Sequence, residues 1–345
     1  MEIIIEIINR HRDLSPNTLK GYYKSLDRLK NKLNIDLVPD FLKSPEIILN
    51  YIKTEFKKPY QLNLLNAYIV AVDSWLKDGT THNPMDDSYI LENGLALFKK
   101  YQMEIKYELD KTKYDEAKTP KEEENWINWE TVEKTVGENF KGLKDILKLT
   151  KSEISKKDIQ QVQLWVISGL YGSGEQNPPL RLDYNRMVII SKEKYEQEKE
   201  AGLTEGQNFL IIESSKIKYF LLAEYKTVSK FGKKSLKVGS KLNTILNKWI
   251  KIREKYGIDN PYLLFNNQEK AVGESAMSMY IKDAFKLTGK SIKANLLRHI
   301  FISDVVIDMS LKKRKKMADF MCHSLEQQLI YNKLPSGDSS GDESN

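Results

Sequence analysis

The chain is poor in cysteine and histidine, with one cysteine, Cys322, and four histidines among its 345 residues. A lone cysteine excludes a disulfide within the chain and a cysteine-rich zinc site. No apolar run approaches the roughly 18 residues that a membrane span needs. The first twelve residues carry four charged side chains and lack a small-residue cleavage site, so they do not read as a secretory signal. The sequence therefore predicts an intracellular protein that is neither secreted nor embedded in a membrane.

Several common catalytic motifs are also missing from the sequence. It has no glycine-rich phosphate loop followed by Lys and Ser or Thr, no HExxH helix and no GxSxG turn. Their absence argues against a P-loop nucleotide hydrolase, a zinc peptidase of that type and an α/β-hydrolase. No Asp, Glu or His cluster has the spacing of metal ligands. We therefore expect chemistry that uses basic side chains and needs neither metal nor cofactor.

Basic residues, in contrast, are plentiful. Lys and Arg number 55 against 48 Asp and Glu, which gives a net charge of +7. The last twelve residues, 334–345, hold three acidic residues and no basic one, so residues 1–333 carry +10. A basic folded body favours a polyanionic partner, most often nucleic acid. The acidic end has no apolar periodicity, and we expect it to be disordered.

Apolar periodicity divides the chain into two domains. We expect residues 1–109 to be helical throughout and residues 126–333 to be mostly helical with a small sheet. Between them, residues 110–125 are strongly polar and contain a proline, which is typical of an exposed linker. The predicted fold class is mainly α with a small antiparallel β-sheet. The predicted helices are 16–33, 45–56, 60–77, 88–109, 129–136, 142–149, 157–171, 241–256, 274–287 and from 292 onwards, and the predicted strands are 187–190, 209–213, 219–225 and 235–238.

The last part of the body combines arginine, histidine and tyrosine. Leu296-Leu297-Arg298-His299 is followed by Cys322-His323 and then by Tyr331, the only tyrosine downstream of Arg298. Guanidinium groups neutralise the non-bridging oxygens of a phosphate, and a phenol can act as a nucleophile. The combination is suited to phosphoryl transfer without a metal.

These residues resemble the motifs of the tyrosine recombinase (phage integrase) superfamily, which read roughly His-x-Leu-Arg-His and Leu-Gly-His, with the tyrosine eight or nine residues later. The matching segments here are Asn295-Leu-Leu-Arg298-His299, Met321-Cys322-His323 and Tyr331. The family's first arginine is matched by Arg181 in Pro-Pro-Leu-Arg-Leu-Asp-Tyr, a form similar to the eukaryotic and large-DNA-virus branch. Its lysine is matched by Lys226, at the end of a predicted strand. The motif order covers residues 126–333.

The resemblance implies a helical, SAM-like core-binding domain over residues 1–109 and an α+β catalytic domain over residues 126–333. It further implies a site-specific recombinase or integrase that cleaves and rejoins double-stranded DNA through a 3′-phosphotyrosine intermediate. Four protomers would exchange strands on the DNA, with a monomer possible in solution. A type IB topoisomerase-like enzyme uses the same chemistry and stays an alternative. A non-catalytic DNA-binding protein with this fold is another.

The resemblance also assigns roles to single residues. Tyr331 is the nucleophile, Arg181 and Arg298 stabilise the pentacoordinate phosphate, and Lys226 protonates the leaving 5′-oxygen. His323 donates to the phosphate or orients the tyrosine. Two residues depart from the family pattern: Asn295 stands where His or Lys is usual, and Cys322 replaces a glycine. Alternatives within the chain are Arg186 for the first arginine and Lys230, Lys233 or Lys234 for the lysine, while His299 is expected to be structural.

Basic residues outside these motifs are candidates for contacts with DNA phosphates. Lys20, Lys24 and Lys30 lie on the first predicted helix, away from its apolar stripe. Lys312, Lys313 and Arg314 begin a run of five bases that ends at Lys316. This run has three readings: a solvated helix face, a set of phosphate contacts or a nuclear import signal.

Overall fold

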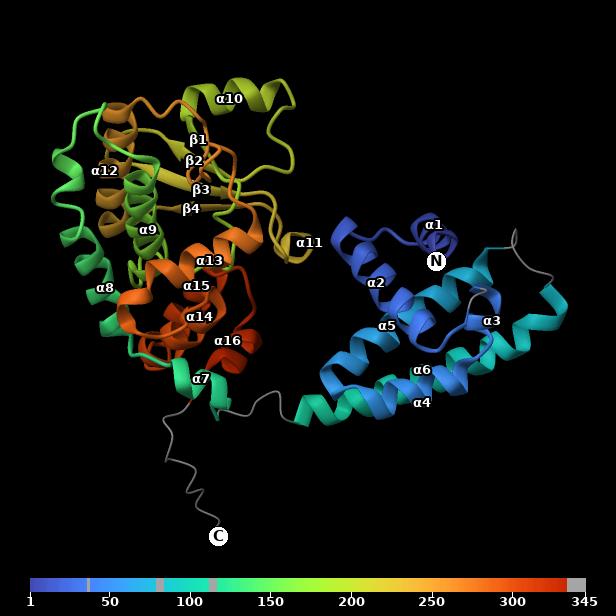
Figure 1. Ribbon diagram of the computed structural model, residues 1–345. Coiled ribbons are helices and arrows are strands. Elements are labelled where there is room, and N and C mark those ends of the chain that lie inside the picture. Colours follow the sequence, from blue (N-terminus) through green and yellow to red (C-terminus); the bar gives the residue numbers. More distant parts are fainter. Residues whose placement is uncertain (36–37, 79–83, 112–116, 334–345) are drawn as a thin grey trace, which may run out of the picture. The chain divides into compact units, whose positions relative to one another are not determined.

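The structure is a computed structural model that describes residues 1–35, 38–78, 84–111 and 117–333. It divides into two compact units, Met1–Asp115 and Glu116–Asn345 (Figure 1). The predicted acidic tail, residues 334–345, and residues 112–116 of the predicted linker lie outside the described residues. No helix in the described part of the chain is both long and apolar enough to cross a bilayer.

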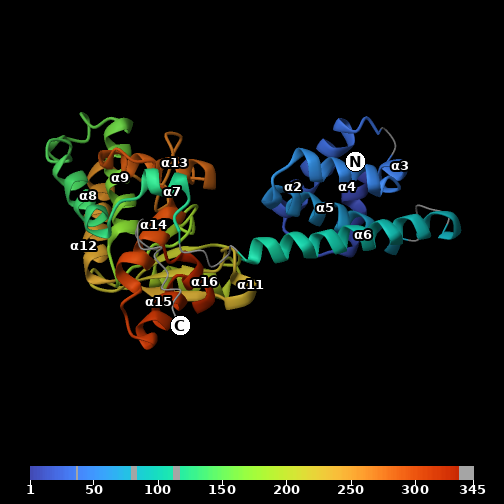
Figure 2. The same ribbon diagram turned by 90° about the horizontal axis from the view of Figure 1, so that it is seen from below.

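The first unit is built from helices. They are α1 (Glu2–His11), α2 (Pro16–Lys32), α3 (Val38–Leu42), α4 (Pro45–Glu55), α5 (Lys58–Lys77) and α6 (Pro84–Lys111). Helix α2 begins where the sequence predicts, because Ser15 Oγ accepts a hydrogen bond from the Thr18 N–H at 3.2 Å. Helix α5 packs against α1, α2, α4 and α6, and Tyr68 at its centre stacks on Phe98 with ring centroids 4.0 Å apart. Figure 2 shows α6 as a long helix that runs beside α4 and α5.

The second unit contains one four-stranded sheet in the order β1-β2-β3-β4. Its strands are β1 (Val188–Ser191), β2 (Phe209–Ile212), β3 (Lys218–Leu222) and β4 (Lys234–Lys237). The predicted small sheet is confirmed, and β2–β3 and β3–β4 are antiparallel. The prediction of a wholly antiparallel sheet is wrong, because β1 pairs with β2 in parallel.

A helix explains the parallel pair. The segment between β1 and β2 contains α10 (Lys192–Glu200). Ser191 Oγ caps this helix by accepting from the Lys194 N–H at 3.2 Å. A crossover of this length carries the chain back, so that β2 runs in the same direction as β1.

Helices surround the sheet in the second unit. They are α7 (Pro120–Asn125), α8 (Trp129–Lys141), α9 (Lys156–Gly172), α11 (Val228–Phe231), α12 (Ser240–Tyr256), α13 (Glu274–Ala284), α14 (Ala294–Phe301), α15 (Leu311–Phe320) and α16 (Leu325–Tyr331). Figure 1 shows α14, α15 and α16 grouped below the sheet. The predicted helix 142–149 is instead a loop with a single 3-10 turn, Ile146–Lys148. The core of this unit includes Leu170 on α9 and Trp249 on α12, both fully buried.

Helix α7 lies inside the segment that was predicted to be an exposed linker. Thr119 Oγ1 accepts from the Glu122 N–H at 3.3 Å, and Glu122 Oε2 accepts from the Thr119 N–H at 2.9 Å, which together form a capping box. Buried Asn125 accepts the Ser291 N–H through Oδ1 at 2.7 Å. The polar composition therefore marks a short capped helix fastened to the second unit, not a free connection.

Candidate active site

Tyr331 is the last residue of α16, and its side chain is 6% exposed. The His323 ring lies 5.6 Å from the tyrosine ring, between centroids, and the His299 ring lies 4.7 Å away in an edge-on arrangement. The guanidinium carbon of Arg298 is 5.1 Å from the same ring centroid. The structure therefore brings together Tyr331, Arg298 and His323, which are separated by up to 33 positions in the chain.

Arg298 is fully buried on α14. Its Nη1 donates to the Pro179 carbonyl at 2.8 Å, and its Nη2 donates to the Met321 carbonyl at 3.3 Å. Its Nε has no acceptor among the described residues. Burial lowers the pKa of the guanidinium, because a charge loses hydration in this position. A buried cation held by neutral carbonyls, with a spare N–H, is suited to an anionic ligand.

Arg181 lies on the segment after α9, where its carbonyl accepts a hydrogen bond from the Tyr171 hydroxyl. The Arg181 side chain is half-buried, and its positive charge helps to lower the pKa of Tyr331. Its competitor Arg186 is exposed on the turn before β1, with a φ of 51°. Arg181 therefore acts on the tyrosine electrostatically, whereas Arg186 lies on an exposed turn.

The two arginines change the acidity of Tyr331. Burial by itself raises the pKa of the phenol, but the charges of Arg298 and Arg181 and their hydrogen bonds outweigh it and lower the pKa. The phenolate, the more reactive form, is then reached at a lower pH than for a free tyrosine. Three other tyrosines of this unit have raised pKa values: Tyr171, Tyr184 and Tyr225. Burial raises the pKa of each phenol, and nearby positive charge does not outweigh that effect.

His323 is 4% exposed, and its Nδ1 donates to the Ser324 carbonyl at 2.9 Å. Burial, and then the charge of Arg298, lower the pKa of His323 to about 3. The ring is therefore neutral at pH 7, with Nε2 as a hydrogen-bond acceptor and without a partner among the described residues. Of the two roles expected for His323, orienting the tyrosine fits this tautomer, whereas donating to a phosphate does not.

The low pKa of His323 predicts an acid-sensitive fold. An unfolded histidine titrates near pH 6.5, so below that pH the unfolded chain takes up a proton that the folded chain refuses until about pH 3. We expect the free energy of unfolding to fall by about 2 kcal/mol more between pH 6.5 and 4.5 in the wild type than in His323→Gln. Urea unfolding at the two pH values measures this. An equal fall in both proteins contradicts the prediction.

Lys226 and Asn295 differ from the buried residues around Tyr331, because both are exposed. Lys226 is exposed in the turn between β3 and α11, and β3 ends earlier than predicted, at Leu222. The neighbouring Thr227 donates through Oγ1 to the Cys322 carbonyl at 2.9 Å, which fastens this turn beside His323. Asn295 is exposed, and its Nδ2 is 3.2 Å from His299 Nε2.

The other lysines of the turn have different neighbours. Lys234 forms an ion pair with Asp319 of α15. Lys230 lies over the ring of Phe231, with its ammonium nitrogen 5.5 Å from the centroid. Of these lysines, Lys226 is the one next in sequence to Thr227, whose hydroxyl donates to the Cys322 carbonyl beside His323.

Sequence reasoning missed Asp183 as part of this site. Its Oδ2 accepts from the Arg181 N–H at 3.1 Å. Burial raises the pKa of Asp183, and the charges of Arg298 and Arg181 oppose that rise. Asp183 therefore lies within electrostatic range of both arginines. The sequence feature that could have identified Asp183 is its position two residues after Arg181 in the Pro-Pro-Leu-Arg-Leu-Asp-Tyr segment.

Cys322 occupies a left-handed backbone conformation, with a φ of 55°, and its side chain is buried. A side chain with a Cβ atom is strained there, whereas glycine is not. We expect Cys322→Gly to be more stable than Cys322→Ala by about 1 kcal/mol, because both remove the thiol and only glycine removes the strain. Denaturant unfolding of the two variants measures the difference. Equal stability, or a more stable alanine variant, contradicts it.

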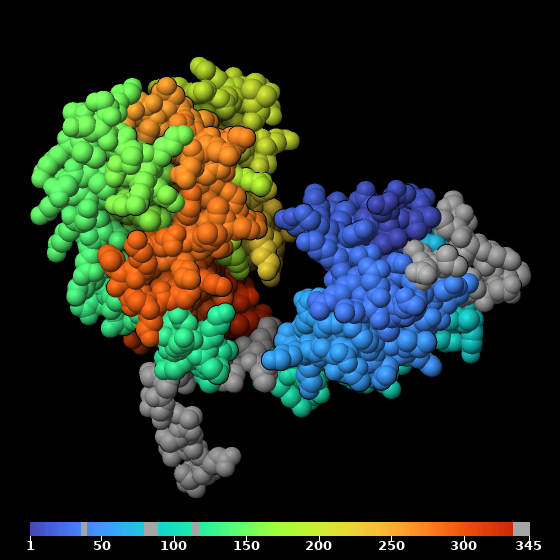
Figure 3. Space-filling view, viewed as in Figure 1, coloured from blue at the N-terminus to red at the C-terminus, as the bar shows by residue number. Residues whose placement is uncertain are grey.

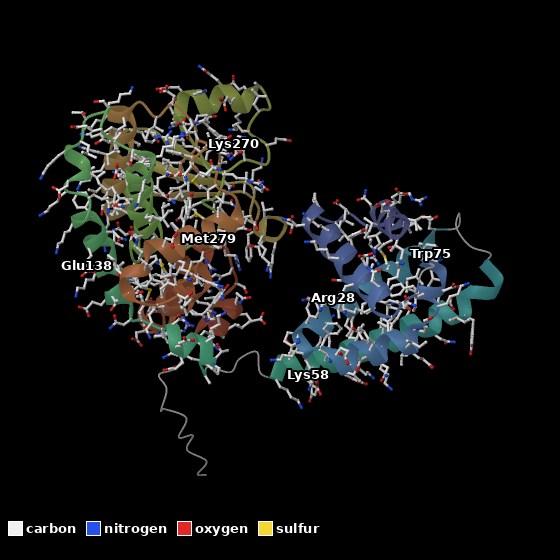
Figure 4. The ribbon with its side chains drawn as sticks, in the orientation of Figure 1. Arg28, Lys58, Trp75, Glu138, Lys270 and Met279 are labelled. Carbon is white, nitrogen blue, oxygen red and sulfur yellow. The ribbon has the colours of Figure 1, made fainter. Side chains whose placement is uncertain are left out.

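Candidate DNA-contacting residues lie on both units. Lys20 and Lys24 are exposed on α2 and Lys30 is half-buried, while Arg28 on the same helix lies over the rings of Phe56 and Tyr60. Figure 4 labels Arg28 among the side chains of the first unit. On α15, Lys312 and Lys313 are exposed and Arg314 is half-buried, its carbonyl accepting from Gln328 Nε2 at 3.2 Å. The described residues toward the C-terminal end of the second unit form the orange and red surface in Figure 3. Over the described ranges, no group of three or more His, Cys, Asp or Glu is placed to hold a metal ion.

Comparison with known proteins gives no match to a family model and no curated relative. The solved structures that are similar include two recombinases. The crystal structure of XerA recombinase shares 14% identity, with 96% of this chain and 92% of that chain covered and a TM-score of 0.39. The XerH site-specific recombinase, bound to a palindromic difH substrate in a post-cleavage complex, shares 13% identity, with 92% and 75% covered and a TM-score of 0.44. Over most of its length, the chain is thus similar to two solved recombinase structures.

Proposed function

We propose that the protein is a tyrosine-type DNA strand transferase, a site-specific recombinase or integrase. The observation that carries the proposal is the environment of Tyr331, whose phenol is buried yet has a lowered pKa because Arg298 and Arg181 act on it. A phenol whose pKa is lowered by two guanidinium groups is suited to attack a phosphodiester.

The reaction exchanges one phosphodiester for another. The Tyr331 oxygen forms a bond to the scissile phosphorus, the bond from phosphorus to the 5′-oxygen breaks, and a 3′-phosphotyrosine remains. The phenolic proton is released to solvent as the lowered pKa of Tyr331 favours the phenolate, His323 orients the tyrosine, and Lys226 supplies a proton to the leaving 5′-oxygen. Arg181 and Arg298 neutralise the non-bridging oxygens, on which negative charge develops. A free 5′-hydroxyl of another strand then attacks the phosphotyrosine and restores the tyrosine.

Double-stranded DNA is the proposed partner of both domains. Residues 1–109 form the core-binding domain, with Lys20, Lys24 and Lys30 as phosphate contacts. Residues 126–333 form the catalytic domain, in which exposed Lys312 and Lys313, with Arg314, provide further phosphate contacts. Strand exchange would take place in a tetramer assembled on DNA, in the compartment where that DNA lies.

A covalent-capture experiment tests this function without knowledge of the target site. The protein is incubated, without added metal, with a pool of nicked duplex oligonucleotides that are randomised around the nick, so that cleavage releases a short strand and traps the enzyme. SDS-resistant adducts are digested, and the modified peptide is identified by mass spectrometry. We expect the nucleotide on Tyr331 and on none of the other 17 tyrosines. Modification of a different residue, or DNA binding without any adduct, contradicts the proposal.

A further inference from the structure

The main chain around Lys226 is held in place by its neighbours. Buried Asn208 binds it just before the lysine, because its Oδ1 accepts from the Glu224 N–H and its Nδ2 donates to the Glu224 carbonyl, both at 2.8 Å. The Tyr225 hydroxyl closes the turn by donating to the Gly232 carbonyl at 2.6 Å. Lys226 is thus an exposed side chain on a fixed main chain.

Thr227, the next residue, connects this turn to the active site. It stands at the N-cap of α11, a position where a threonine hydroxyl commonly caps its own helix. Here the hydroxyl makes no capping bond to α11 and donates instead to the Cys322 carbonyl, 95 positions along the chain, at 2.9 Å. The hydrogen bond therefore joins two distant segments, and helix capping does not account for it.

The segment that accepts this bond is the turn after α15. The helix ends in a Schellman motif with the left-handed Cys322 just beyond its last residue. Carbonyls at a helix end have no partner within the helix and take donors from elsewhere. Arg298 Nη2 donates to the Met321 carbonyl at 3.3 Å, Thr227 donates to the next one, and His323 follows. Three consecutive residues thus connect the buried arginine, the Lys226 turn and the histidine beside the tyrosine.

A second contact fixes the far end of the same turn. Lys234, at the start of β4, forms an ion pair with Asp319 of α15. The Asp319 side chain is 65% exposed, and ion pairs at such positions stabilise a structure only weakly. The pair also lies eight positions from Lys226, whereas Thr227 is adjacent to it. The placement of Lys226 therefore depends mainly on Thr227.

We propose that Thr227 is a positioning residue for Lys226, because its hydrogen bond to the Cys322 carbonyl holds the proton donor at the turn that carries His323. The proposal deepens the proposed function and rests on it, since Lys226 is there the group that protonates the leaving 5′-oxygen. A misplacement of about 1 Å in a reacting group can cost roughly a hundredfold in rate, so the loss of this bond has a measurable effect. The contact itself is a property of the free protein.

A substrate with a sulfur leaving group isolates the proton transfer. When the bond from phosphorus to the 5′-oxygen breaks, the oxygen takes a proton from Lys226 and becomes a 5′-hydroxyl. With sulfur in place of that oxygen, the phosphorus–sulfur bond breaks and a thiolate leaves without a proton, because thiols are far more acidic than alcohols. A misplaced proton donor therefore slows the oxygen substrate alone, whereas general damage to the site slows both.

Matched variants separate positioning from folding. Thr227→Val replaces the hydroxyl by a methyl group of similar size, and Thr227→Ser keeps the donor. Ser229→Ala removes an exposed hydroxyl from the same turn, and Lys226→Ala is made alone and together with Thr227→Val. The readouts are the single-turnover rate of adduct formation on the captured oligonucleotide, with oxygen or sulfur at the cleaved position, and the hydrogen exchange of the amides of residues 223–233 in the free protein.

For Thr227→Val we expect adduct formation about 30-fold slower on the oxygen substrate, within about threefold of the wild type on the sulfur substrate, and faster exchange at residues 223–233. Thr227→Ser and Ser229→Ala should match the wild type, and Thr227→Val should add no loss in the Lys226→Ala background. Equal defects on both substrates, a wild-type rate on oxygen, or a further loss in the Lys226→Ala background overturn the proposal. If the wild type forms no adduct, the proposed function fails, and the exchange rates still decide whether Thr227 holds the turn.

Discussion

Replacing Tyr331 by phenylalanine is expected to abolish covalent capture of DNA, a loss of about 10⁴-fold or more, while binding of the same DNA is retained. The substitution removes one oxygen atom, and that atom is the proposed nucleophile. The phenyl ring keeps its place between the rings of His299 and His323, at centroid distances of 4.7 and 5.6 Å, so the packing of α16 is preserved. Adduct yield on denaturing gels and a mobility shift under native conditions measure the two properties.

Tyr184→Phe is the matched control for this variant. Tyr184 is fully buried in the same unit, and its hydroxyl makes only a long hydrogen bond of 3.5 Å to the Leu170 carbonyl. Its pKa is raised by burial, in contrast to that of Tyr331. The control should form adduct at the wild-type rate. Adduct formation by Tyr331→Phe would assign the nucleophile to another side chain, and loss of DNA binding would show that the substitution disturbs more than one atom.

The elements that the sequence predicted correctly are those with local causes. Helix α2 follows from an apolar stripe and the cap at Ser15, and α9 and α12 follow from long periodic runs. The fold errors have non-local causes. The parallel pairing of β1 with β2 depends on how α10 crosses the sheet, and no local pattern specifies it. Helix α7 carries a recognisable Thr-x-x-Glu cap, but its polar composition outweighed that signal.

The candidate site divides in the same way. Motif order along the chain was enough to propose Arg298, His323 and Tyr331, and the structure places these three together. The environment of each residue was beyond the sequence, since it comes from distant segments. Glu122 reaches His299 from 177 positions upstream, and the tautomer of His323 is set by the Ser324 carbonyl. A motif identifies which residue types meet, whereas burial and neighbouring charges decide what each of them does.

Arg298→Lys is expected to slow adduct formation by about 10³-fold, although it keeps a basic residue. The guanidinium has five N–H donors in a rigid fork, and the carbonyls of Pro179 and Met321 engage only Nη1 and Nη2. A lysine that satisfied the same two carbonyls would have one donor left for a phosphate oxygen. Burial also lowers the pKa of a cation at this position, and an ammonium loses its proton far more readily than a guanidinium.

The lysine variant should also change the pH dependence of the reaction. The charge of Arg298 is the first of the effects that lower the pKa of Tyr331, so a lysine that turns neutral lets that pKa rise. The rate should then need a higher pH to reach its plateau, and Arg186→Lys, on the exposed turn, should leave both rate and profile unchanged. Single-turnover rates between pH 6 and 9 measure both effects. A rate within threefold of the wild type would show that positive charge alone is sufficient, and the fixed fork of Arg298 would then have no role in the chemistry.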